Sequence, residues 1–165
     1  MYPSRHIFFG LCFTILLHLL FPVVSLFELS LFFLSSFLID TDHYLYYVIK
    51  KRDLRLNRAY KWFVSKRKKY LVLSVDNRKK YYSSFCFFHG IESILFFVLL
   101  GIFFNKFFLF IAFGMLLHLI LDLYEAIFVV KSRIDKISII YDYFKLKSLN
   151  PLWTNHLIIV QFFTP

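Results

Sequence analysis

The chain has 165 residues, 59% of them hydrophobic, with a mean hydropathy of +0.65 and a formal net charge of +10 at pH 7. Soluble globular domains average about 45–50% apolar residues, so this composition argues against a soluble domain and favours one compact membrane protein. The charge would suit a nucleic-acid partner in a soluble protein, but we expect none, because membrane topology explains the basic residues. Two cysteines inside apolar runs exclude a disulfide framework.

Four apolar runs, taken in chain order, predict four membrane-spanning helices. They cover residues 7–21, 23–39, 83–104 and 107–130. Pro22 separates the first two runs, and a short turn at Asn105 and Lys106 separates the last two. A helix needs about 17–20 apolar residues to cross a bilayer, which these runs approach or reach. The predicted fold class is therefore all-α, a polytopic membrane protein whose residues 1–130 form a four-helix transmembrane bundle.

The stretch between the second and third runs, residues 50–82, is strongly basic. Lysines and arginines alternate with aromatic residues, and only Asp53 and Asp76 oppose them. This pattern predicts one or two amphipathic helices on the inner face of the bilayer. The simplest interpretation is a solvated cytoplasmic loop. A sharper and compatible one makes membrane lipids with anionic headgroups the partners of this loop.

The distribution of positive charge predicts the topology. With four spans, the N-terminus, the basic loop and the tail share one side, and Lys106 alone lies on the other. We expect a protein of the inner, cytoplasmic membrane with both termini in the cytoplasm. The tail, residues 131–165, is predicted to be cytoplasmic or interfacial. Apolar residues at helical spacing suggest that it contains a surface helix, namely Ile134, Ile137, Tyr141 and Phe144.

Ionisable residues gather at the cytoplasmic ends of the predicted helices. Such residues are rare in membrane segments, usually avoid lipid and often mark function. His89 and Glu92 are three residues apart, and His118 and Asp122 are four apart, so each pair would project from one face of its helix. We therefore expect all of these side chains to converge in the inner half of the bundle. They are His6; Asp40, Asp42 and His43; His89 and Glu92; and His118 and Asp122.

Imidazole and carboxylate groups without thiolate predict a divalent metal site, with zinc first and manganese or iron as alternatives. The set exceeds what one tetrahedral zinc needs, so either two or more metals bind or some residues support the ligands from behind. Glu92 is predicted to be a ligand or the general base. Structural alternatives remain: Asp40 at a hydrated helix end, His118 in a buried structural pair, and His6 as a solvated terminal residue.

The order of these motifs resembles that of the membrane-bound predicted metal-dependent hydrolases, a family that includes a LexA-regulated inner-membrane protein of bacteria. The resemblance covers residues 1–125. It rests on the early His6, then Asp40-Thr41-Asp42-His43, then His89-Gly90-Ile91-Glu92-Ser93, then Gly114-Met115-Leu116-Leu117-His118 followed by Asp122. The Arg of the family's third motif is absent here, and its second His is either replaced by Glu92 or lost. A distant similarity to zinc phospholipase C and P1-type nucleases implies phosphoester substrates.

The resemblance and the polar pattern together predict an integral membrane metal-dependent hydrolase. Its expected substrate is a phosphoester or lipid-like ester at the cytoplasmic face. The rival hypothesis is a non-enzymatic membrane protein, either a transporter or a protein that organises lipids and partners, with the polar residues as a structural network. Transporters more often show broken helices and internal repeats, which the sequence lacks. Convergence of the four motifs would favour the enzyme.

Overall fold

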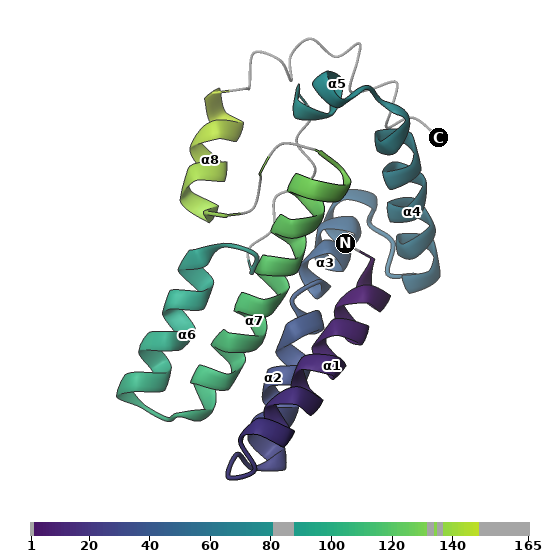
Figure 1. Ribbon diagram of the computed structural model, residues 1–165. Helices are drawn as coiled ribbons and strands as arrows, with labels where there is room; N and C mark the ends of the chain where they lie inside the picture. The colour runs from purple at the N-terminus through teal and green to yellow at the C-terminus, as the bar shows by residue number, and fades with distance from the viewer. Residues whose placement is uncertain (1, 81–87, 132–133, 135–136, 149–165) are drawn as a thin grey trace.

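The computed structural model describes residues 2–80, 88–131, 134 and 137–148, and all of the secondary structure in this part is helical. Four helices lie side by side and form the lower body of the molecule in Figure 1. They are α1 (Pro3–Leu20), α2 (Leu26–Leu38), α6 (Ile91–Phe103) and α7 (Phe107–Tyr124), the last continuing into a π-helical turn, η1 (Glu125–Val129). The all-α prediction is therefore confirmed.

Local chemistry sets the turns at the lower end of this body. Helix α2 begins with a capping box, in which Ser25 and Glu28 satisfy each other's free backbone N–H groups. Glu28 also forms an ion pair with Lys106, Nζ to Oε1 2.7 Å, across to the turn between α6 and α7. The side chain of Asn105 accepts a hydrogen bond from the backbone N–H of Phe107 as α7 begins. The two hairpin turns are thus tied together.

Small residues allow three of the helices to pack closely. Helix α7 packs mainly on α2 and α6, and α1 packs on α2. A Cβ atom on Gly10 of α1 would collide with the hydroxyl of Ser36 in α2. A Cβ atom on Gly114 of α7 would collide with the carbonyl oxygen of Phe32 and the hydroxyl of Ser35, both in α2. Contacts of this kind are typical of helices that associate within membranes.

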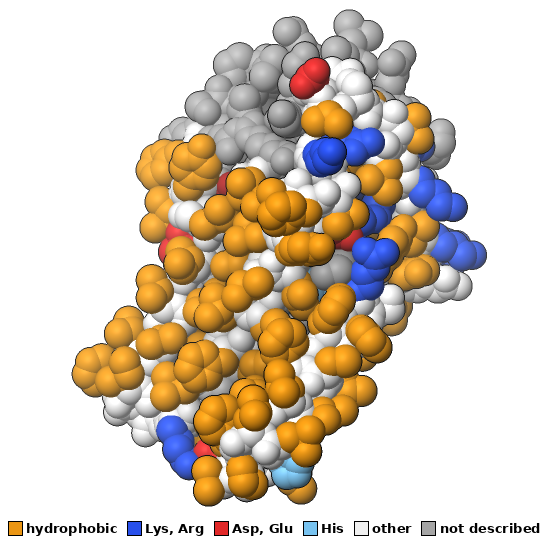
Figure 2. Space-filling model, in the orientation of Figure 1, with side chains coloured by type: hydrophobic (Ala, Val, Ile, Leu, Met, Phe, Trp, Pro, Cys, Tyr) orange, Lys and Arg blue, Asp and Glu red, His pale blue; other side chains and the backbone are white. Residues whose placement is uncertain are grey.

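Among the described residues, two helices are long and apolar enough to cross a membrane, namely Pro3–Leu20 and Phe107–Val129. Helices α2 and α6 have 13 residues each, which is below the usual length of a span. Large hydrophobic side chains nevertheless cover the lower body in Figure 2, as at Leu19, 72% exposed, and Phe104, 78% exposed. The number of spans, predicted to be four, therefore stays a prediction.

The other helices lie around the upper end of the body (Figure 1). They are α3 (Thr41–Lys51), α4 (Leu56–Val72), α5 (Val75–Lys80) and α8 (Ile139–Ser148). Lysine and arginine side chains gather over α4 in Figure 2, where the amphipathic loop was predicted. The predicted tail helix is found as α8, but it starts later than the pattern suggested, so Ile134 and Ile137 precede it. Residues 149–165 lie outside the described part of the chain.

The predicted third run differs from the observed helix where the site lies, whereas the second run ends at residue 39, close to the observed end of α2. The chain leaves α2 at Leu38 and begins a new helix, α3, at Thr41, so Asp40 lies at a break between helices. Helix α6 begins only at Ile91, after Gly90 in an extended conformation with φ −83° and ψ 153°. The prediction that His89 lies inside a helix is therefore wrong. Gly90 ends the non-helical segment that carries this imidazole.

Candidate metal centre

Four separate parts of the chain bring imidazoles and carboxylates together at the upper end of the bundle. Helix α1 supplies His6 from its second turn, and α7 supplies His118 and Asp122. The break between α2 and α3 supplies Asp40, while the first turn of α3 supplies Asp42 and His43. The bend before α6 supplies His89. Three of the imidazoles are fully buried, with side-chain exposures of 0% at His6, His89 and His118.

Two imidazoles face each other at the centre of this cluster. The Nε2 atoms of His89 and His118 lie 3.2 Å apart. The Nδ1 atom of His118 lies 2.9 Å from the carbonyl oxygen of Ser36, and the Nδ1 atom of His89 lies 2.9 Å from Oδ2 of Asp42. A carbonyl and a carboxylate only accept hydrogen bonds, so both Nδ1 atoms carry the protons. Two Nε2 lone pairs would then repel each other unless a proton or a metal cation lies between them.

Two carboxylate oxygens complete the surroundings of this imidazole pair. Oδ1 of Asp40 lies 3.5 Å from Nε2 of His89 and 3.6 Å from Nε2 of His118. Oδ2 of Asp122 lies 3.8 Å and 3.6 Å from the same two nitrogens. Ligands about 2.0–2.1 Å from a tetrahedral zinc lie about 3.3–3.4 Å apart. These five separations, from 3.2 to 3.8 Å, are close to the spacing that the ligands of one tetrahedral cation require.

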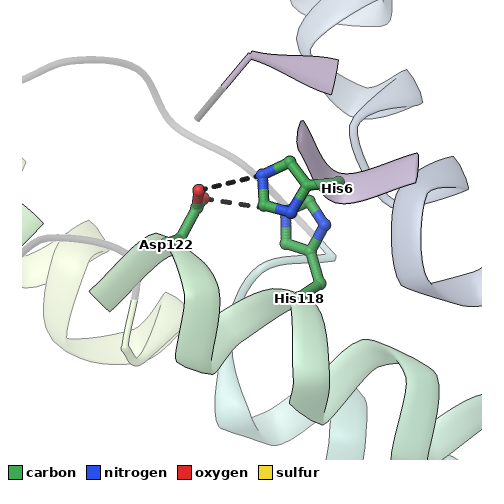
Figure 3. A group of neighbouring side chains, drawn as sticks. All are labelled: His6, His118 and Asp122. Atoms are coloured by element: carbon green, nitrogen blue, oxygen red, sulfur yellow. Dashed lines mark ion pairs between the residues drawn. The ribbon is translucent and has the colours of Figure 1, made fainter. Parts of the chain in front are cut away.

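His6 and His43 extend the cluster on opposite sides. Figure 3 shows the ring of His6 stacked on that of His118, with centroids 3.8 Å apart, and Asp122 reaching both. Nε2 of His6 lies 3.2 Å from Oδ1 of Asp122. Nε2 of His43 lies 3.7 Å from Oδ1 of Asp40. Two groups of three residues have donor atoms within 4.8 Å of one another: His6, His118 and Asp122, and Asp40, His43 and His89.

The protonation of Asp40 and the burial of the cluster suit a cation. Burial alone would raise the pKa of the Asp40 carboxyl, but the stabilising effect of the neighbouring imidazoles, with that of His89 the largest, outweighs it. The pKa of Asp40 is therefore held below its usual range, and the group is ionised at neutral pH, as a metal ligand must be. Nδ1 of His6 and Oδ2 of Asp40 are buried without hydrogen-bond partners among the described residues.

Glu92 is the one predicted site residue whose contacts lead elsewhere. Its carboxylate accepts hydrogen bonds from the backbone N–H groups of Ile139, at 2.9 Å, and Ile140, at 3.3 Å, and from the hydroxyl of Ser138. These groups open helix α8, whose first N–H groups have no partners within the helix. Glu92 thus caps α8, and its predicted role as ligand or general base has no support in this geometry.

Asp42 also lies differently from the prediction, behind His89 rather than beside the facing Nε2 atoms. Its Oδ2 atom accepts from Nδ1 of His89 and from the backbone N–H of Phe88, at 3.2 Å. Carboxylates in this position orient metal-binding imidazoles and raise their basicity. The carbonyl of Ser36 does the same for His118, and sequence reasoning missed it. The small residues of α2 opposite Gly114 were the available signal.

An ion cluster lies next to the site, and its two arginines were not predicted from the sequence. Glu125 of η1 accepts hydrogen bonds from Arg67 of α4 and from Arg5 of α1. The only signal was the spacing of Glu125, three residues after Asp122. Besides the contact of Arg67 with Glu125, helix α4 approaches the His and Asp cluster at Phe63, whose ring lies 5.6 Å from that of His43.

Comparison of the chain with family models, with curated proteins and with solved structures finds no match. The resemblance of the motifs to the membrane-bound hydrolases therefore stays an expectation based on the quoted residues.

Proposed function

We propose that this protein is an integral membrane metal-dependent hydrolase that cleaves a phosphoester or lipid-like ester at the cytoplasmic face of the inner membrane. The observation that supports it most is the facing pair of Nε2 atoms of His89 and His118, 3.2 Å apart. Both imidazoles are fixed from behind by acceptors, and two carboxylates flank them. His89 and His118, with Asp40 and Asp122, would hold a cation that relieves the repulsion between the two Nε2 atoms.

The donor set suggests zinc, with manganese or iron as alternatives, and leaves room for two ions. Imidazole and carboxylate without thiolate are suitable ligands for all three metals. The carboxylates of Asp40 and Asp122 each contact imidazoles on both sides of the cluster, which is the arrangement expected of bridging ligands. A pair of divalent ions would supply an activated water and stabilise the leaving oxygen.

The residues of the chain itself would orient the metal-binding imidazoles and leave one side of the cluster open to solvent. Asp42 and the Ser36 carbonyl keep the Nε2 atoms of His89 and His118 unprotonated and aimed at the cluster. His43 has a side-chain exposure of 22%, whereas His6, His89 and His118 have none, so solvent reaches the cluster from the α3 side. We expect the substrate to approach from this side.

The metal content of the purified protein tests the proposal. The wild type is expected to bind at least one equivalent of zinc, and His118→Ala and Asp122→Ala are each expected to lose most of it. His18→Ala is the matched control, because His18 lies exposed in the last turn of α1, about 18 Å along the helix from His6. Metal content that neither site variant changes would exclude a metal centre here.

The rival function, a non-enzymatic membrane protein, is favoured by one observation. A proton shared between His89 and His118 would also relieve the repulsion at 3.2 Å. The cluster would then be a structural polar network in a protein that transports solutes or organises lipids. Imidazole ¹⁵N chemical shifts and zinc titration distinguish the metal centre from the shared proton. The rival function predicts that one of the two rings is protonated and that the protein binds no added zinc.

A further inference from the structure

Two arginines lie beside the metal cluster, and both contact the same buried carboxylate. Arg67 of α4 places Nη2 2.9 Å from Oε1 of Glu125 and Nη1 3.3 Å from Oε2. Arg5 of α1 places Nη1 3.4 Å from Oε1 of the same residue. The Glu125 side chain is only 5% exposed. Two guanidinium groups from distant parts of the chain therefore share one buried negative charge.

Neighbouring residues place these arginines next to the cluster. Arg5 directly precedes His6, and Glu125 follows Asp122 by three residues. The Arg5–Glu125 and His6–Asp122 pairs thus form two adjacent links between α1 and the upper end of α7. Residues three apart on a helix are about 5–6 Å apart at their Cβ atoms. Glu125 also opens the π-helical turn, a feature that is frequent at functional sites.

Arg67 has donor capacity that its contacts leave unused. A guanidinium offers five N–H donors in a rigid fork. The Nε atom of Arg67 is buried and has no hydrogen-bond partner among the described residues. The side chain as a whole is 23% exposed, so solvent reaches it. The ring of Tyr2 lies 4.7 Å from the guanidinium carbon and helps to fix its plane.

We propose that Arg67 and Arg5 form an anion subsite that binds the phosphoryl group of the substrate beside the metal cluster. This inference rests on the proposed function and narrows its substrate class to phosphate esters. Two guanidinium groups bind an anionic phosphoryl group, whereas an uncharged ester carries no charge for them to neutralise. Arginine binds phosphate through two parallel charge-assisted hydrogen bonds, as Arg67 binds Glu125 here. Glu125 occupies this fork when no phosphate is bound, and phosphate competes with it.

Binding of inorganic phosphate to the full-length protein tests the subsite. We suggest equilibrium dialysis in phosphatidylcholine nanodiscs, both with zinc and after chelation. Arg67→Lys keeps the charge but loses the fork, so phosphate binding is expected to weaken by about tenfold. Arg58→Lys is the matched control, because Arg58 lies on the same helix and pairs instead with Asp53, at 3.4 Å. Phosphate affinity that Arg67→Lys leaves unchanged would overturn the subsite.

Glu125→Gln separates a binding role from a structural one. If Glu125 competes with phosphate for Arg67, removal of its charge strengthens phosphate binding by several-fold. If the ion pair only holds α4 against α7, the same variant lowers the unfolding temperature and does not strengthen phosphate binding. The second result would overturn the proposal, even where Arg67→Lys weakens binding by disturbing the fold.

Different results would overturn the proposed anion subsite and the proposed hydrolase function. Phosphate binding that depends on Arg67 in a protein that takes up no metal would overturn the hydrolase and support the subsite. Metal binding without such phosphate binding would overturn the subsite alone. Nanodiscs that contain phosphatidic acid identify the source of the phosphoryl group. Competition between this lipid and soluble phosphate supports a lipid headgroup at the subsite, and binding of soluble phosphate without competition supports a soluble phosphoester.

Discussion

The carboxylate of Asp42 contacts the imidazole of His89 on the side that faces away from His118. This position lets Asp42 fix the ring and its tautomer without touching a bound ion through the same oxygen. Asp42 was predicted to be a metal ligand, and the geometry favours a positioning role. A direct ligand and a positioning residue differ in how much zinc affinity is lost when Asp42 is replaced conservatively.

We expect Asp42→Asn to weaken zinc binding by about 10–100-fold, as is typical for partners behind a ligand, while the site still fills at excess metal. The amide keeps the shape of the side chain but is a weaker acceptor for Nδ1 of His89. Titration against a competing chelator measures the effect. Asp53→Asn is the control, because Asp53 accepts a hydrogen bond from Tyr47, at 3.1 Å, outside the cluster. Complete loss of metal would make Asp42 a direct ligand.

Glu92 shows that residue type and spacing alone do not assign a role. We expect Glu92→Ala to leave zinc affinity unchanged within about twofold. The N-terminal turn of α8 should instead loosen, since loss of a helix cap costs about 0.5–2 kcal/mol. Hydrogen exchange at the amides of Ile139 and Ile140 is expected to speed up correspondingly. Lost zinc affinity with unchanged exchange would restore the predicted role of Glu92 as a ligand.

Among the elements, the long helices and the turns at Pro22 and at Asn105 and Lys106 could be predicted from the sequence, and the bend at His89 could not. Continuous apolar runs mark α1 and α7 closely, because each contains enough apolar residues for one long helix. A new helix begins at Thr41 just after the predicted end of the second run, whereas the bend at His89 interrupts a run whose composition gives no such sign. There, tertiary contacts of polar side chains override helix propensity. Both breaks carry cluster residues, and non-helical backbone is what aims His89 at His118.

Close packing of α7 on α2 is the other requirement of the site at this scale. Gly114 lies one turn before His118, and its missing side chain lets the two helices approach near the Ser36 carbonyl that orients His118. We expect Gly114→Ala to lower stability by about 1–3 kcal/mol and also to weaken zinc binding, because the helices must separate.

Gly101→Ala is the control for that substitution. A Cβ atom there would lie 2.5 Å from the Leu109 side chain, so packing of α6 on α7 suffers in the same way. Gly101 lies near the turn at the opposite end of the bundle (Figure 1). We therefore expect Gly101→Ala to lower the unfolding temperature but to spare zinc affinity. Equal losses of zinc affinity in both variants would mean that stability alone controls binding.

Over the whole molecule, apolar and basic surfaces are separated along the bundle. Exposed hydrophobic side chains cover the lower body in Figure 2, and basic side chains gather over α4 near the metal cluster. Composition and charge bias alone predicted this separation, together with the convergence of polar residues at the basic end. Which atoms face one another could not be predicted, since it depends on rotamers and on helix breaks.

The predicted membrane orientation follows from this separation, and chemical labelling of single cysteines tests it. The background variant carries Cys12→Ala and Cys86→Ala, into which Lys61→Cys on α4 or Lys106→Cys between α6 and α7 is introduced. The positive-inside rule predicts that a membrane-impermeant reagent labels Lys106→Cys in intact spheroplasts and labels Lys61→Cys only after permeabilisation. Labelling of both in intact cells would place α4 outside the cytoplasm. Labelling of neither would mean that the α6–α7 turn does not cross, which would leave fewer than four spans around the same metal cluster.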